Sequence, residues 1–209
     1  MSYLTLAGDV HAELEVKRSR FLATVRRVPD EAAALALVAE HRRLYHAAGH
    51  HCSAFVIGPD QALVRVSDDG EPAGTAGMPM LNVLTGLGLS DVAAVVTRHF
   101  GGTLLGAGGL VRAYSGAVAA ALEDARMIRR LRREIFAVTV EAGQAGQLES
   151  AVRNRGITVR GVEYGATEVV LTVAVAPGAV GSLQSLVATI TAGSASLQPA
   201  GQDWVDEPL

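Results

Sequence analysis

The sequence is poor in cysteine and in lysine, and each shortage excludes a class of protein. Cys52 is the only cysteine in 209 residues, so the chain has no internal disulfide framework and no zinc site built from several thiolates. Lys17 is the only lysine, and the formal net charge is −3. The chain as a whole is therefore not a polycation, and any surface that attracts nucleic acid must be local.

Long hydrophobic runs are missing as well. No stretch approaches the roughly 18–20 apolar residues that a membrane span needs, and the N-terminal segment has no apolar core of signal-peptide length. We therefore expect a cytoplasmic protein that does not bind membranes. Almost half of the residues are apolar and about a fifth are charged, which is typical of soluble globular proteins.

The first part of the chain predicts a mixed α/β domain. Strands are expected on either side of residues 17–20, followed by a helix that begins at Asp30 as its N-cap. The apolar spacing of that helix predicts a core-facing side formed by Leu35, Val38, His41 and Tyr45. The next expected elements are a hairpin over 52–57 and 63–67, a helix over 75–87, a buried strand over 92–96 and a helix over 110–126.

The pattern restarts after a basic segment, residues 126–133. It predicts a strand over 135–141, a helix over 144–155, a hairpin over 157–164 and 167–176, a helix after Pro177 and a last strand at 196–199. This is the order of elements in ferredoxin-like domains. We therefore predict an α+β protein with two domains, residues 1–128 and 134–200, and a loose acidic tail at 201–209.

The segment from Arg98 to Tyr114 is the most unusual part of the chain, because a buried strand leads through a glycine-rich connection into a helix. The N-terminus of a helix binds phosphate or carboxylate readily, and arginine side chains match phosphate oxygens. The residues of this candidate anion site are Arg98, Gly101, Gly102, Gly106, Gly108, Gly109 and Arg112. The spacing fits neither a Walker A loop nor a Rossmann loop, so a tight turn and close helix packing account for the glycines equally well.

A second candidate is an acidic turn formed by Asp68, Asp69 and Glu71. Mg²⁺ favours such oxygens together with a substrate phosphate, and carboxylates also serve as general acids or bases. However, Asp-Asp-Gly is ordinary turn chemistry, and these carboxylates could cap the neighbouring helix or pair with Arg98 or Arg112. We favour this structural interpretation.

The histidines give weaker signals. In a strand, His50 and Cys52 point to one face and His51 to the other, so the three do not converge on one metal ion. His99 could act as a base, but no nucleophile with an orienting acid can be assigned to it.

Two basic clusters are candidates for contact with phosphate. One is the patch Lys17, Arg18 and Arg20, and the other is the segment 126–133. Such charge runs are more often simply solvated, and the second could instead bridge the two domains.

Four segments together resemble the YigZ/IMPACT family: residues 17–21, 50–52, 67–80 and 98–114. The resemblance covers residues 10–125, and its two longest motifs are too extended to arise by chance. His99 is a departure, since the family leads us to expect a tyrosine there.

The resemblance implies an N-terminal domain like the second domain of ribosomal protein S-five, and a C-terminal ferredoxin-like domain similar to the last domain of elongation factor G. Both of those proteins work on the ribosome, which favours RNA phosphate as the anion. We therefore expect a non-enzymatic regulator of translation that associates with RNA or the ribosome, without a cofactor. The alternatives are a Mg²⁺-dependent phosphoryl-transfer or hydrolytic enzyme and a protein-interaction module without affinity for nucleic acid.

Overall fold

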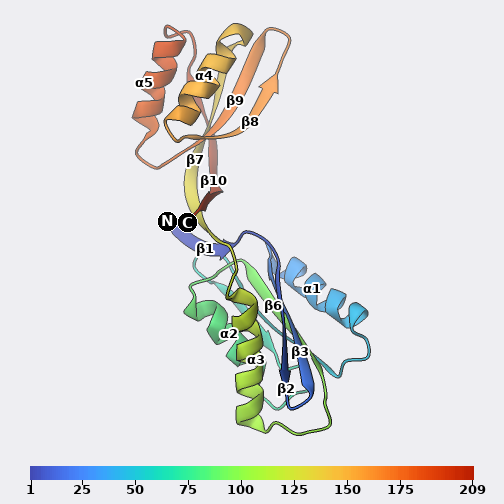
Figure 1. Cartoon of the computed structure of the whole chain (residues 1–209). Helices are drawn as coiled ribbons and strands as arrows, with labels where there is room; N and C mark the ends of the chain where they lie inside the picture. Colours follow the sequence, from blue (N-terminus) through green and yellow to red (C-terminus); the bar gives the residue numbers. More distant parts are fainter. The chain divides into compact units, whose positions relative to one another are not determined.

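The computed structural model describes residues 1–209 and divides into two compact units (Figure 1). The N-terminal unit comprises residues 2–129 with 207–209, and the C-terminal unit comprises Met1 with residues 130–206. The chain contains two sheets and five helices, which confirms the predicted α+β class with two domains. None of the helices combines the length and the apolar character needed to cross a membrane.

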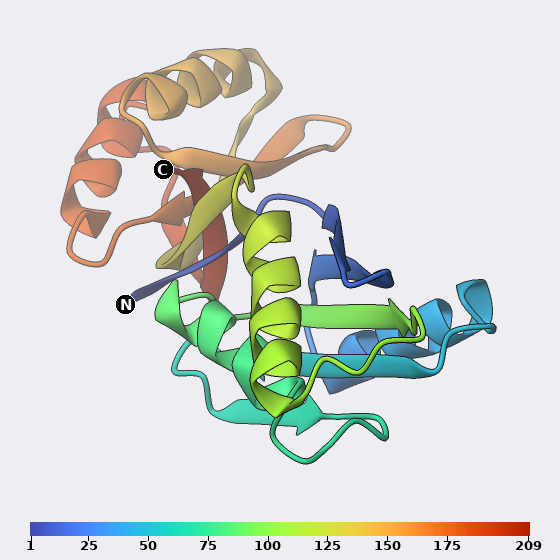
Figure 2. The same cartoon turned by 60° about the horizontal axis from the view of Figure 1, so that its bottom comes forward.

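The N-terminal unit is built on an antiparallel sheet with the strand order β2-β3-β6-β4-β5. Its strands are β2 (Val10–Val16), β3 (Ser19–Arg27), β4 (His50–Ile57), β5 (Leu63–Ser67) and β6 (Val92–His99). The helix α1 (Glu31–Leu44) covers one face, while α2 (Gly77–Gly86) and α3 (Ala107–Leu122) cover the other (Figure 2). A short strand, β1 (Ser2–Leu6), pairs with β7 (Met127–Glu141).

Two cores follow from the alternation of side chains along the central strands. Val56 and Ala94 face α2 and α3 in the larger core, whereas Phe55 and Ala93, the adjacent residues, face α1 in the smaller one. Because successive strand residues point to opposite faces, a strand buried on both sides reads as a continuous apolar run. This explains the unbroken Val92–Val96 pattern.

The side of α1 that faces the core differs from the prediction by one residue. Ala34, Leu37 and His41 are buried, whereas Leu35 is 55% exposed. The prediction weighted large apolar side chains, but a small alanine allows the helix to approach the sheet closely. The start of the helix is as predicted, since the Asp30 carboxylate accepts a hydrogen bond from Ala33 N–H at 2.8 Å.

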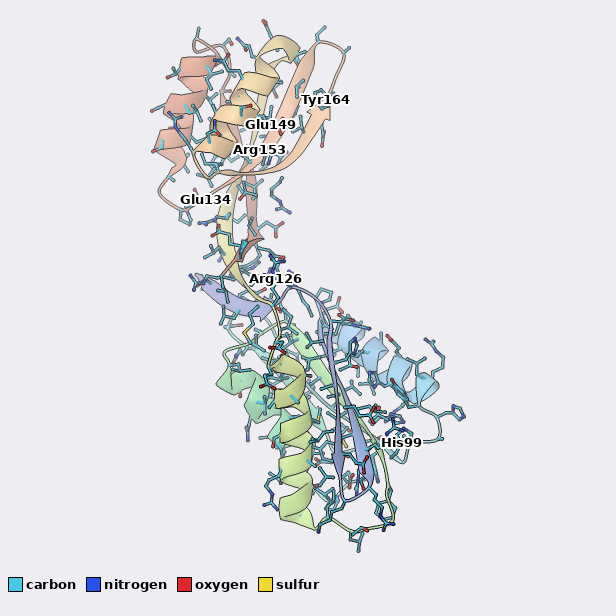
Figure 3. The ribbon with its side chains drawn as sticks, in the orientation of Figure 1. His99, Arg126, Glu134, Glu149, Arg153 and Tyr164 are labelled. Atoms are coloured by element: carbon cyan, nitrogen blue, oxygen red, sulfur yellow. The ribbon has the colours of Figure 1, made fainter.

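The C-terminal unit has the predicted order strand, helix, strand, strand, helix, strand. Its elements are β7 (Met127–Glu141), α4 (Ala142–Asn154), β8 (Thr158–Tyr164), β9 (Glu168–Val175), α5 (Val180–Ile190) and β10 (Leu197–Pro208). β9 lies between β7 and β8, and β10 also pairs with β7. The core contains Leu148, Leu171 and Leu183, and an exposed pair on α4 joins Glu149 to Arg153 at 2.8 Å (Figure 3).

The expectation of a loose tail at 201–209 was wrong, because residues 197–208 form β10. Pairing with β7 satisfies the backbone of this segment. Its acidic side chains also have partners: Asp203 pairs with Arg160, and Asp206 pairs with Arg130 at 3.0 Å. Most of the basic segment 126–133 is likewise the start of β7 rather than a linker.

Candidate functional site

Arg98 and Glu71 form an ion pair inside the N-terminal unit. Arg98 Nη1 lies 2.7 Å from Glu71 Oε1, and the two side chains are 6% and 4% exposed. The Tyr114 hydroxyl donates to the same oxygen at 2.7 Å. The pKa of Tyr114 is raised, mainly by burial. The pair that the structural interpretation anticipated is therefore present, and Arg98 is directed into the protein rather than toward a ligand.

Arg98 also ties the glycine-rich segment to the sheet. Its Nη2 donates to Ser19 Oγ at 3.4 Å, and the same oxygen accepts from Gly101 N–H at 3.1 Å. The guanidinium carbon lies 5.5 Å from the centre of the Phe21 ring and 5.4 Å from that of Phe100. These contacts give Arg98 a positioning role for the loop.

The three carboxylates of the acidic turn point to different partners. Asp68 accepts from the N–H groups of residues 74, 76 and 77 at 2.8, 3.0 and 2.8 Å, and so caps the start of α2. Burial by itself raises the pKa of Asp68, but these three donors outweigh burial and the pKa is lowered. Asp69 accepts from His51 N–H at 2.7 Å and from Arg42.

A metal site is therefore not formed by the acidic turn in this arrangement, since its carboxylates do not converge. No group of three or more His, Cys, Asp or Glu side chains in the chain is placed to hold a metal ion. Cys52 is buried and donates to the Asp68 carbonyl at 3.0 Å, and burial raises the pKa of its thiol to about 12.

Part of the glycine-rich segment is explained by backbone geometry. A Cβ on Gly101 would lie 2.1 Å from the Arg18 carbonyl carbon, so only glycine fits where the loop crosses the β2–β3 turn. Gly102 and Gly106 have φ values of 83° and 71°, which side chains rarely adopt. Gly108 and Gly109 instead belong to the first turn of α3, where no side chain caps the helix.

The tip of the β2–β3 hairpin and the start of α3 enclose a hollow of about 160 Å³. Lys17 from the hairpin and Arg112 from α3 both line it, as does Gly109. We call this place the basic hollow; its lining residues are Leu14, Val16, Lys17, Leu105, Gly109, Arg112 and Ala113. One residue of the basic patch, Lys17, and one residue of the candidate anion site, Arg112, thus line the same hollow.

The other basic residues of the hairpin have partners of their own. Arg18 Nη2 donates to Thr103 Oγ1 at 3.1 Å and fixes the hairpin tip to the loop. Arg20 pairs with Glu13 at 2.6 Å on the exposed surface. Among the predicted basic residues, Lys17 and Arg112 are therefore the two that line the hollow.

The hairpin tip has an unusual sequence for its conformation. Val16 pairs with Ser19, so the turn has two residues, and Lys17 and Arg18 have φ values of 47° and 67°. Such turns favour Asn-Gly, and a non-glycine residue in this region costs about 1–3 kcal/mol. The chain keeps two long cationic side chains there at a cost to the backbone, which points to a role for the side chains.

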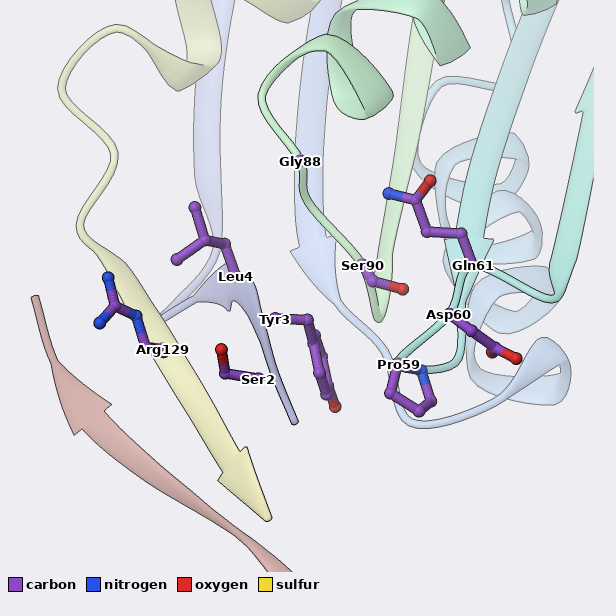
Figure 4. A pocket seen from close by; sticks show the side chains of 9 residues that line it. All are labelled: Ser2, Tyr3, Leu4, Pro59, Asp60, Gln61, Gly88, Ser90 and Arg129. Atoms are coloured by element: carbon purple, nitrogen blue, oxygen red, sulfur yellow. The ribbon is translucent and has the colours of Figure 1, made fainter.

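A larger hollow of about 510 Å³ lies beside β1 (Figure 4). Its two charged residues, Asp60 and Arg129, are on opposite sides of it. The Tyr3 hydroxyl donates to Asp91, and the Ser90 hydroxyl donates to the Gly58 carbonyl. Because its polar groups either bond within the protein or lie apart, this hollow is a weaker candidate than the basic hollow.

Comparison with known proteins gives matches along most of the chain. Residues 17–122 match the Impact N-terminal domain, and residues 138–194 match a domain of unknown function, DUF1949. The chain is 37% identical over 198 residues to the IMPACT family member YigZ of Escherichia coli, covering 94% of this chain and 97% of the relative. It is also 37% identical over 163 residues to the IMPACT family member YvyE of Bacillus subtilis, covering 78% and 75%.

A solved structure described as that of a hypothetical protein is similar as well, with a TM-score of 0.65 and 37% identity over 94% of this chain and 96% of that one. The domain match covers the same motifs that carried the resemblance in the sequence. The chain belongs to the IMPACT family.

Proposed function

We propose that the N-terminal unit binds RNA phosphate in the basic hollow, and that the protein is a non-enzymatic regulator of translation associated with RNA or the ribosome. The observation that carries the proposal is that Lys17 and Arg112 line one hollow at the N-terminus of α3. Two cationic side chains then act together with the positive end of a helix dipole, which amounts to roughly half a charge.

The size and charge of the basic hollow suit one phosphate group. At about 160 Å³, it is smaller than the roughly 300–1,000 Å³ of pockets that enclose whole small molecules. The chain as a whole is slightly acidic, with a formal charge of −3. Attraction to a polyanion must therefore come from a local site such as this one, and a phosphate that projects from a longer ligand fits it better than a free nucleotide.

The family resemblance favours RNA as the source of the phosphate, because the domains that it implies occur in proteins that work on the ribosome. No base-reading contact is required at the basic hollow, since phosphate contacts position a protein without specifying sequence. We therefore expect binding that depends strongly on salt and weakly on base sequence.

The test is fluorescence anisotropy of the full chain with labelled single-stranded RNA, duplex RNA and DNA over a salt series. The logarithm of the affinity for single strands should fall with the logarithm of salt by about 0.7 for each phosphate contact. Lys17→Ala and Arg112→Ala should each weaken binding for every RNA sequence and reduce this slope by about one contact.

Arg20→Ala is the matched control, because it removes the same charge from the same hairpin but outside the basic hollow. It should leave the salt dependence unchanged. Equal losses in all three variants would contradict the site, and the absence of binding even at low salt would contradict RNA contact. The second result is the one that a protein-interaction module predicts.

A further inference from the structure

Phe100 is the most exposed aromatic residue of the N-terminal unit. It directly follows β6, whose last residue, His99, is labelled in Figure 3, and it is 55% exposed. Tyr45 is half-buried, and the other aromatic residues of this unit are buried, namely Tyr3, Phe21, Phe55 and Tyr114. Because burial of a phenylalanine side chain stabilises a fold, the exposed ring contributes less to stability than its size allows.

One face of the Phe100 ring rests on a fixed cation. The guanidinium carbon of Arg98 lies over the ring, 5.4 Å from its centre, an arrangement that attracts a cation to the ring. Arg98 itself is held by Glu71 at 2.7 Å and by Ser19 at 3.4 Å. Since the guanidinium occupies one face and the residue is more than half exposed, the opposite face of the ring is open to solvent.

The backbone beside the ring is also fixed. Gly101 N–H donates to Ser19 Oγ at 3.1 Å, and a Cβ on Gly101 would lie only 2.1 Å from the Arg18 carbonyl carbon. Arg18 in turn donates to Thr103 Oγ1 at 3.1 Å. The connection that carries Phe100 is therefore anchored to the β2–β3 hairpin. A ring held in this way is preorganised, so a ligand does not have to order it on binding.

The connection after Phe100 leads directly to the basic hollow. Leu105 lines that hollow together with Lys17 and Arg112, and it is five residues beyond Phe100. Five residues span at most roughly 18 Å when fully extended, which limits the separation of the two places. Stacked nucleotides of one strand follow each other at about 3.4 Å. A single strand of about six nucleotides is therefore long enough to contact both.

The chemistry of the two places together selects one kind of ligand. A phenylalanine ring has no donor or acceptor, so its complement is a flat π surface, whereas Lys17 and Arg112 in the basic hollow require an anion. An unpaired nucleobase with its phosphate supplies both. Bases in a duplex are stacked on one another and are not available to a side chain, whereas those of single strands can be splayed out and stacked on aromatic rings.

We propose that Phe100 is a stacking platform for an unpaired base of single-stranded RNA, whose backbone phosphate occupies the basic hollow. The inference rests on the proposed function and deepens it, because it makes the ligand single-stranded rather than duplex RNA. Every base has a π face, so stacking tolerates all sequences. The platform therefore agrees with the weak dependence on sequence that we expect of the phosphate contacts.

The first arm of the test is fluorescence anisotropy of the full chain with one labelled RNA, either single-stranded or annealed to its complement. The wild type should bind the single strand more tightly. Phe100→Leu should weaken binding of the single strand at least about fivefold, the lower end of the loss of one stacking partner, and leave binding of the duplex unchanged. Phe100→Tyr keeps an aromatic ring and should retain the affinity of the wild type.

Leu104→Ala is the matched control. Leu104 lies on the same connection and is 83% exposed, so this variant removes apolar surface from the connection without removing a ring. It should bind both forms of RNA as the wild type does. An equal loss in Leu104→Ala and Phe100→Leu would indicate a general apolar contact and would overturn the stacking role.

The second arm needs no variant and uses NMR of the wild-type chain bound to the single strand. Nuclear Overhauser contacts are expected between the ring protons of Phe100 and base protons of the RNA. Their absence from the bound state would overturn the proposal, and would mean that the ring only shields the buried pair of Arg98 and Glu71 from water.

Failure of this inference differs from failure of the proposed function. If Lys17→Ala and Arg112→Ala weaken binding of the single strand but Phe100→Leu does not, the phosphate site stands and the stacking platform is refuted. Equal affinity of the wild type for single strand and duplex would refute the platform in the same way. Absence of any RNA binding would overturn the proposed function and this inference with it.

Discussion

Removal of the negative charge from the buried ion pair should destabilise the N-terminal unit strongly. Glu71→Gln keeps the size of the side chain and an oxygen that can accept from Tyr114, but it leaves the guanidinium of Arg98 without a counter-ion. Both side chains are less than a tenth exposed, at 4% and 6%. Breaking a buried pair by removing one partner typically costs about 3–5 kcal/mol, because the remaining charge is no longer compensated.

The magnitude expected for this pair is near the lower end of that range, about 3 kcal/mol. The retained acceptor and the rings of Phe21 and Phe100 beside the guanidinium offset part of the loss. Glu71→Gln combined with Arg98→Met should recover much of the stability, since replacing both charges by groups of similar volume is often neutral or stabilising. Glu13→Gln is the matched control, and it should cause no measurable change because the pair with Arg20 is exposed.

The assay is native-state hydrogen exchange of the amides of β6, the central strand that carries Arg98. Exchange reports the stability of one unit at a time, whereas a single unfolding midpoint is poorly defined for a chain with two units. The only tryptophan, Trp204, lies in the C-terminal unit. Its fluorescence during urea unfolding should therefore be the same in all variants.

Two results would refute this reasoning. If Glu71→Gln lowers the protection of β6 no more than Glu13→Gln does, the buried pair does not hold the loop to the sheet. If the double variant is no more stable than Glu71→Gln alone, the loss does not arise from an uncompensated charge.

Three further predictions concern stability measured by thermal or urea unfolding. Because the pKa of His41 is about 4 when folded and about 6.5 when unfolded, the unfolded state binds the proton first. Stability should therefore fall by at most about 3 kcal/mol as the pH drops from about 6.5 to 4, and should then level off. An equal fall in the His41→Leu variant would contradict this assignment. Gly101→Ala should destabilise the protein by about 1–3 kcal/mol or more through its clash with Arg18, whereas Gly108→Ala, with no close contact, should not. Asp30→Ala should cost about 1 kcal/mol through loss of the helix cap, and an unchanged midpoint would contradict the role of that cap.

Features that depend on a few neighbouring residues were predictable from the sequence. The cap at Asp30, the hairpin around residues 58–62 and the order of elements after residue 134 all follow from local spacing and turn chemistry. The strand β10 was missed in part because its acidic sequence gives no local signal. Its stability comes from pairing with β7, which is far away in the sequence.

The unusual segments could also be recognised before the fold was known: the acidic turn, the glycine-rich connection and the cationic hairpin tip. The contacts that their residues make could not be recognised before the fold was known. Folding turns Arg98 inward to Glu71 and places Lys17 beside Arg112 in one hollow.

No pattern in the sequence could have marked Thr97, because a threonine in an apolar strand is ordinary. Yet its hydroxyl lies 3.0 Å from Nδ1 of both His41 and His51, which are 56 and 46 residues earlier in the chain. Residue types and local spacing set what chemistry is available, but partners and burial depend on strand register and helix packing over long sequence separations. For that reason, the family and most of the elements could be read from the order of residues, whereas the candidate sites emerged only from the folded arrangement.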